Sequence, residues 1–122
     1  MNKKLEDFNW HDKILHQILI DRSAPGIIDE VIIDLKDIDS FIRIVFKEVY
    51  WLSMDMNFGI VSEDSILRLV ISENENDEDL ISFYRKWGNY IKDFKFRKYL
   101  LELNSSGSIL KLIAKETEIK YL

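Results

Sequence analysis

The first residues with recognisable chemical potential are His11 and Asp12, in FNWHDKILHQILIDRSAPG (residues 8–26). A histidine beside an aspartate can serve a metal site or a general base. The chain has one other histidine, His16, and no cysteine, whereas mononuclear zinc usually takes three protein ligands. His11 and His16 are five residues apart, so on a regular strand they point to opposite faces. We therefore predict no metal site and no cofactor.

The sequence also shows no arrangement of residues typical of nucleophilic catalysis. A nucleophile needs a base and an orienting group within hydrogen-bond reach, but adjacent side chains such as His11 and Asp12 diverge on an extended chain. The serines of NSSGS (104–108) are typical of a hairpin loop. We predict no catalytic residue and interpret Trp10, His11 and Asp12 as a structural motif before a strand. In it, Asp12 accepts backbone N–H bonds and His11 packs beside Trp10.

An alternative stays open, in which a small ligand-binding or hydrolytic domain uses His11, Asp12 and nearby aromatic residues. Carboxylates are abundant, but ENENDED (73–79) lacks the glycine that an EF-hand loop places at its sixth position. The four glycines are dispersed, so no glycine-rich phosphate loop is present.

The charge balance excludes one class of partner. There are 22 acidic and 17 basic residues, with a net charge of −5, and the basic residues are interleaved with acids. Nucleic-acid binding depends on a basic face, so we predict no nucleic-acid partner. A moderately acidic surface usually serves solubility, and its more specific interpretation is a surface for a basic protein partner.

The segment VYWLSMDMNFG (49–59) mixes aromatic and methionine residues close to a loop, which suits adaptable contacts. For the three tryptophans and their aromatic neighbours, core packing is favoured over a ligand pocket. The candidate partner-binding residues surround this loop and the acidic stretch that follows it: Asp55, Phe58, Glu63, Asp64, Glu73, Glu75 and Asp77.

Alternating apolar residues predict strands over much of the chain. In DEVIIDLKD (29–37), for example, Val31, Ile33 and Leu35 share one face while Asp34 lies on the other. The only proline lies in RSAPG (22–26), a turn between two strands. We predict strands over 13–21, 29–37, 40–56, 96–103 and 108–116, with 117–122 extending the last one past a kink. For 65–72 we favour a strand over a short helix.

One segment has helical spacing. Asp77 suits an N-cap, Leu80, Tyr84 and Trp87 recur on one face, and Gly88 suits a C-terminal stop. We predict a single α+β domain over 1–122, with a largely antiparallel sheet of about six strands and one main helix over about 77–88 packed on it. No secretory signal or membrane-length apolar run is recognisable, so we predict a cytoplasmic protein.

Three stretches together resemble a known group: NWHDKILHQILIDRSAPGIIDEV (9–31), IVFKEVYWLSMDMNFGIVSEDSIL (44–67) and YLLELNSSGSILKLIA (99–114). They are similar to YxiG-like proteins and the immunity protein 50-like families of polymorphic-toxin loci, small bacterial proteins with a Trp/Phe-His-Asp strand start. The resemblance places His11 and Asp12 at the start of the first strand and implies no catalytic residue. It implies a cytoplasmic, non-enzymatic interaction module that neutralises a toxin partner.

Overall fold

The computed structural model describes residues 5, 8–73, 76–91 and 94–122. They form six strands, β1 (Ile14–Ala24), β2 (Ile28–Lys36), β3 (Phe41–Asp55), β4 (Ile66–Ser72), β5 (Arg97–Leu103) and β6 (Ile109–Tyr121). The helix α1 (Glu78–Trp87) and the short 3-10 helix η2 (Gly88–Tyr90) lie between β4 and β5. The strands make one antiparallel sheet in the order β1-β2-β3-β6-β5-β4. The predicted α+β class is confirmed, with 65–72 a strand and 117–121 a continuation of β6.

The first three strands form an antiparallel meander. Gly26 takes a positive φ of 86° in the β1–β2 turn, a conformation that glycine adopts at little steric cost. Val31, Ile33 and Leu35 of β2 are all buried, as the alternation predicts. Asp34 lies on the other face but is only 3% exposed, because Gln17 of β1 and Arg43 of β3 bond its carboxylate.

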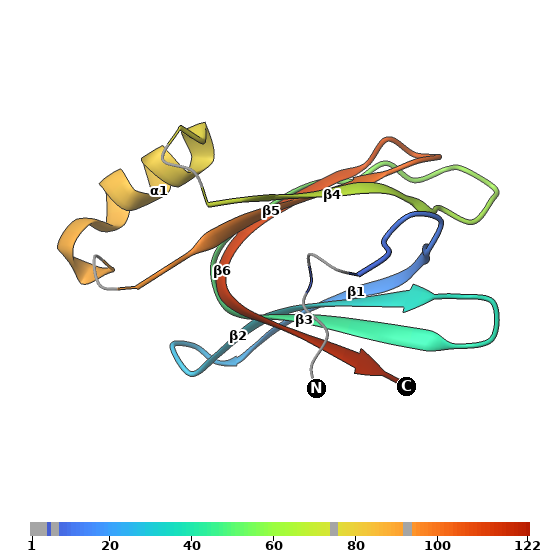
Figure 1. The fold of residues 1–122 in the computed structure, drawn as a ribbon, viewed down its shortest axis with the longest axis horizontal. Coiled ribbons are helices and arrows are strands. Elements are labelled where there is room, and N and C mark those ends of the chain that lie inside the picture. Colours follow the sequence, from blue (N-terminus) through green and yellow to red (C-terminus); the bar gives the residue numbers. More distant parts are fainter. Residues whose placement is uncertain (1–4, 6–7, 74–75, 92–93) are drawn as a thin grey trace.

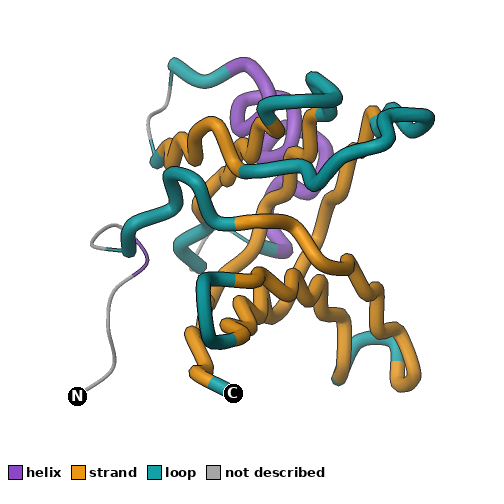
Figure 2. The backbone as a smooth tube through the Cα atoms, turned by 90° about the vertical axis from the view of Figure 1, so that its right-hand side faces the viewer, coloured by secondary structure: helices purple, strands orange, loops and turns teal. Residues whose placement is uncertain are grey.

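The sheet folds over on itself, so that its two halves become two layers (Figure 1, Figure 2). The long strands β3 and β6 pass through both layers (Figure 1). Their pairing passes from Val49↔Ala114 to Trp51↔Ile113 and leaves Tyr50 without a counterpart. Such a β-bulge bends its strand and increases the local twist. Glu48, next to the bulge, has a positive φ of 52°.

Two apolar cores lie on opposite faces of the folded sheet. The inner core fills the space between the layers and includes residues of every strand except β1 among its buried members. The outer core lies under α1 and consists of Leu80, Phe83, Ile91, Phe96 and Ile113, with Trp51 and Trp87 packed against it. Ile113 and Ala114 are neighbours on β6, yet they belong to the outer and the inner core respectively.

The segment before β1 contributes side chains to the inner core. Leu5, Phe8 and Trp10 are 2%, 7% and 7% exposed, and Figure 1 shows the stretch from residue 8 to the start of β1 between the two layers. Close by, the edge strands meet at one end through an isolated bridge between Ile14 and Ser65. The sheet is therefore partly closed on that side.

The helix begins and ends as predicted. The carboxylate of Asp77 accepts from the backbone N–H groups of Asp79 (3.0 Å) and Leu80 (3.1 Å), and Gly88 is the C-cap. The predicted docking face is partly wrong: Leu80 and Phe83 are the buried residues, while Tyr84 is 39% exposed. Leu80 and Phe83 are one turn apart over the sheet, and Tyr84 lies beside them with its hydroxyl accepting the Phe96 N–H at 3.4 Å. Among the described residues, no helix has the length and apolar character needed to cross a membrane.

Candidate functional site

His11 and Asp12 lie in an exposed turn before β1. Their side chains are 66% and 78% exposed, and His11 Nε2 lies 3.5 Å from Asp12 Oδ1. The expectation that adjacent side chains diverge is wrong here, because Asp12 has a positive φ of 65° and the backbone turns. With its carboxylate exposed to this extent, Asp12 does not pair buried N–H groups, and His11 does not pack into the core.

Trp10 carries the structural part of that motif. Its indole N–H donates to the carbonyl of Leu5 at 3.4 Å, and its ring meets Phe8 edge-to-face with centroids 5.1 Å apart. Within the described part of the chain, no three His, Asp or Glu side chains gather closely enough to hold a metal ion. His11 and Asp12 thus form a surface pair rather than an assembled reaction centre.

The loop between β3 and β4 exposes large apolar side chains. Phe58 is 87% exposed, Val61 102% and Ile60 42%. These three residues are called the apolar loop below. Large side chains exposed together in this way are typical of surfaces that bind other molecules.

The ends of this loop are held by the β5–β6 turn. Asn57 donates its backbone N–H to the Ser108 hydroxyl at 2.8 Å. The carboxylate of Asp64 accepts from the backbone N–H groups of Ser105 (2.9 Å) and Ser106 (3.3 Å) and from the Ser106 hydroxyl. The segment NSSGS, predicted only as a hairpin, is therefore also the anchor of the apolar loop.

The predicted acidic contacts near the loop have different surroundings. Asp55 ends β3 and is exposed. Glu63 is 65% exposed, and its carboxylate lies 3.9 Å from the Lys36 ammonium. Asp64 is occupied by the bonds that fix the loop, so Asp55 and Glu63 are the carboxylates that face solvent here.

The second predicted group lies near the start of α1. Asp77 caps the helix and also contacts the ammonium of Lys98 at 2.7 Å, and Lys98 lies 3.0 Å from Asp79. Burial alone raises the pKa of Asp77, but the bonds from Lys98 and the Leu80 N–H outweigh it and hold that pKa below its usual value. Glu73 lies 2.8 Å from Arg97. Asp77 is thus engaged in the fold, and Glu75 lies outside the described residues.

The two predicted acidic groups do not form one patch. The apolar loop precedes β4 and the helix cap follows it, and the seven residues of β4 span about 20 Å at roughly 3.3 Å per residue. Figure 1 shows the β3–β4 loop at the end of the sheet remote from α1. The predicted partner-binding residues therefore belong to two separate places, one at the apolar loop and one at the start of α1.

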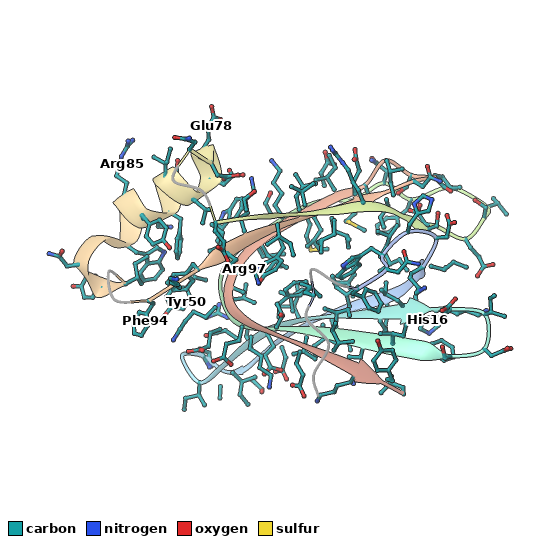
Figure 3. All side chains as sticks on the ribbon, in the orientation of Figure 1. His16, Tyr50, Glu78, Arg85, Phe94 and Arg97 are labelled. Carbon is teal, nitrogen blue, oxygen red and sulfur yellow. The ribbon has the colours of Figure 1, made fainter. Side chains whose placement is uncertain are left out.

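A groove of about 490 Å³ lies at the bend of β3. Tyr50, Trp51 and Trp87 line it together with Ile20 and Ile27 of the β1–β2 hairpin. Figure 3 shows Tyr50 between α1 and that hairpin. The Tyr50 ring is edge-to-face with Trp87 (5.2 Å between centroids) and Phe96 (4.9 Å).

Sequence reasoning missed this groove because it missed the bulge. On a regular strand Tyr50 and Trp51 point to opposite faces, whereas the unmatched position of Tyr50 lets both rings lie on the helix side. The available signal was the run EVYW (48–51), in which two large aromatic residues follow one another in a strand.

No model of a known protein family matches this chain, and no curated protein matches it either. The function proposed for it below therefore rests on the geometry of these surfaces and on the sequence patterns.

Proposed function

We propose that the protein is a non-enzymatic interaction module that binds another protein through the apolar loop. The observation that carries the proposal is the exposure of Phe58 and Val61 on a loop fixed at both ends. A surface that is already ordered loses less conformational entropy on binding. Aromatic anchors of this kind commonly supply much of the binding energy of an interface.

Charge supports a basic partner. The chain carries a net charge of −5, and the exposed carboxylates of Asp55 and Glu63 flank the apolar loop. Complementary charge accelerates encounter and disfavours acidic partners. The apolar loop then supplies contact area, while the surrounding carboxylates orient the partner.

The specific form of this proposal is an immunity-like protein that acts in the cytoplasm and neutralises a toxin. The resemblance of 9–31, 44–67 and 99–114 to immunity families of polymorphic-toxin loci supports it. A toxin encoded beside the gene is therefore the partner to test first, by co-expression and by measuring protection of the host cell.

The same partner gives a direct test of the apolar loop. Replacing Phe58 or Val61 by Ala is expected to raise the Kd about 5- to 30-fold, as loss of an interface anchor does, without changing the melting temperature. The matched control is Ile38→Ala, because Ile38 is 90% exposed in the turn between β2 and β3. Unchanged affinity in both loop variants, measured by calorimetry, would contradict the proposed surface.

A second candidate function, binding of a small ligand, is favoured by the aromatic groove. Its rings, rather than His11 and Asp12, offer a concave aromatic surface of the kind that small-ligand sites use. The hydrolytic form of this alternative has no support in the described residues, because His11 and Asp12 do not line the groove. A ligand screen that follows the indole NMR signals of Trp51 and Trp87 tests it.

A further inference from the structure

Strand β1 is an open edge of the sheet. It pairs with β2 on one side, and on the other side its contacts with the β4 region end at Leu15, whose N–H donates to the Asp64 carbonyl at 2.9 Å. From Gln17 onward, no described segment pairs with this side of β1. Figure 1 shows β1 at the border of the lower layer. Backbone N–H and C=O groups at such an edge can pair with another strand.

Register shifts interrupt β1 between Leu15 and Gln17 and between Asp21 and Ala24, and such bulges are one protection of an edge strand. The regular stretch between them lacks the other kinds of protection. Natural edge strands carry lysine, proline or other charges that discourage pairing. The stretch ILHQILI (14–20) contains no Lys, Arg, Asp, Glu or Pro, and Leu19 and Ile20 are 41% and 56% exposed. The opposite edge strand, β4, is shorter and carries Arg68, which pairs with Glu102 at 2.7 Å.

The sequence of β1 favours a second copy as the occupant. An antiparallel copy centred on Leu19 sets Leu19 against itself and Ile18 against Ile20, so apolar residues meet at the centre. Gln17 then faces Asp21, and no like charges are opposed. Asp34, opposite Gln17, is already bound by Arg43 and Gln17, while Asp21 and Glu30 lie opposite each other at the end of the stretch. Residues 17–20 therefore offer no free carboxylate to a basic segment of another protein.

We propose that two copies of the chain pair through β1, antiparallel about a two-fold axis at Leu19, and so join their sheets into one. An isologous contact of this kind closes after two copies. The paired stretch is 17–21, between the two bulges of β1. It stops short of Ile14 and Leu15, where Ser65 and Asp64 already occupy the edge beside the apolar loop. Each copy therefore retains its loop for a partner.

The absence of cysteine makes a clean test possible. Leu19→Cys is expected to form a disulfide-linked dimer under mild oxidation, because directly opposed residues in antiparallel strands bring their Cβ atoms to about 4.5–5.5 Å. Ile27→Cys, at an 84% exposed position in the β1–β2 turn, is the control and is expected to form no disulfide-linked dimer, because the two-fold axis at Leu19 keeps the two copies of residue 27 far apart. Equal cross-linking of both variants overturns the proposal.

Light scattering provides the second measurement. The wild type is expected to show a concentration-dependent dimer, and Leu19→Lys should weaken it at least about tenfold, because like charges placed directly opposite each other are destabilising. Ile27→Lys should leave the dimer unchanged. A monomer at all concentrations, or a dimer disrupted by Val61→Lys but not by Leu19→Lys, overturns the assignment. The latter result would place the contact at the apolar loop instead.

Discussion

Asp34 and Asp12 carry the same side chain in opposite surroundings. Asp34 is 3% exposed, and its carboxylate accepts from Arg43 Nε at 2.7 Å and Nη2 at 2.9 Å. The hydrogen bond from Arg43 is the main reason that the pKa of Asp34 lies below its usual value, although burial opposes it. Asp12 has a 78% exposed side chain. The stabilising role predicted for the Asp12 carboxylate at the start of the first strand is therefore not supported, and Asp34 is the aspartate that is buried and hydrogen-bonded in the fold.

Asp34→Asn is expected to lower the free energy of unfolding at pH 7 by about 1–3 kcal/mol, the scale of a charge-assisted hydrogen bond. Because folding depresses the pKa of Asp34, the stabilisation is present above the unfolded pKa, near 3.9, and is lost as pH falls through the folded pKa. The difference between wild type and variant should therefore shrink below about pH 4. Urea unfolding at several pH values measures it. The control Asp12→Asn should stay within about 0.5 kcal/mol of the wild type, and a cost equal to that of Asp34→Asn would contradict this account.

At the scale of elements, the sequence pattern predicted the features that depend on neighbouring residues, such as strand alternation and helix ends. The alternation in β2, the Asp77 cap and the Gly88 stop were readable, because each depends on a few neighbouring residues. The bulge at Tyr50 and the groove beside it could not be predicted from the local sequence. A bulge depends on how two strands pair, and the residues of β6 that face Tyr50 lie about sixty positions away. The entry of Trp10 into the inner core and the engagement of Asp64 by the β5–β6 turn likewise depend on distant segments.

The docking of α1 gives a prediction at this scale. Phe83 is 5% exposed and contacts Tyr50 and Phe96, so Phe83→Ala should cost about 3–5 kcal/mol, as truncation of a buried aromatic residue does. Trp87 is only half-buried and borders the groove, so Trp87→Ala should cost less. Thermal or urea unfolding compares them, and a larger cost at Trp87 would show that the outer core centres on the groove rather than on the helix face.

At the scale of the whole molecule, the two cores depend on the same strands. β6 places Ile113 in the outer core and Ala114 in the inner core, and β3 passes through both layers of the sheet (Figure 1). Loss of order in either layer therefore removes support from the other. This continuity distinguishes the molecule from two independently folding halves, even though the helix and the inner core lie on opposite faces.

We therefore expect both cores to unfold in one cooperative transition, as most small domains do. The tryptophans report on them separately, because Trp10 lies in the inner core while Trp51 and Trp87 pack against the outer one. A variant that replaces Trp51 and Trp87 by Phe leaves Trp10 as the probe, and Trp10→Phe leaves the outer pair. Within each variant, the fluorescence midpoint in urea should coincide with the midpoint from circular dichroism of the sheet. An outer-core transition at clearly lower urea would show instead that α1 and the groove open as a separate unit, which would leave the groove, but not the apolar loop, subject to local unfolding.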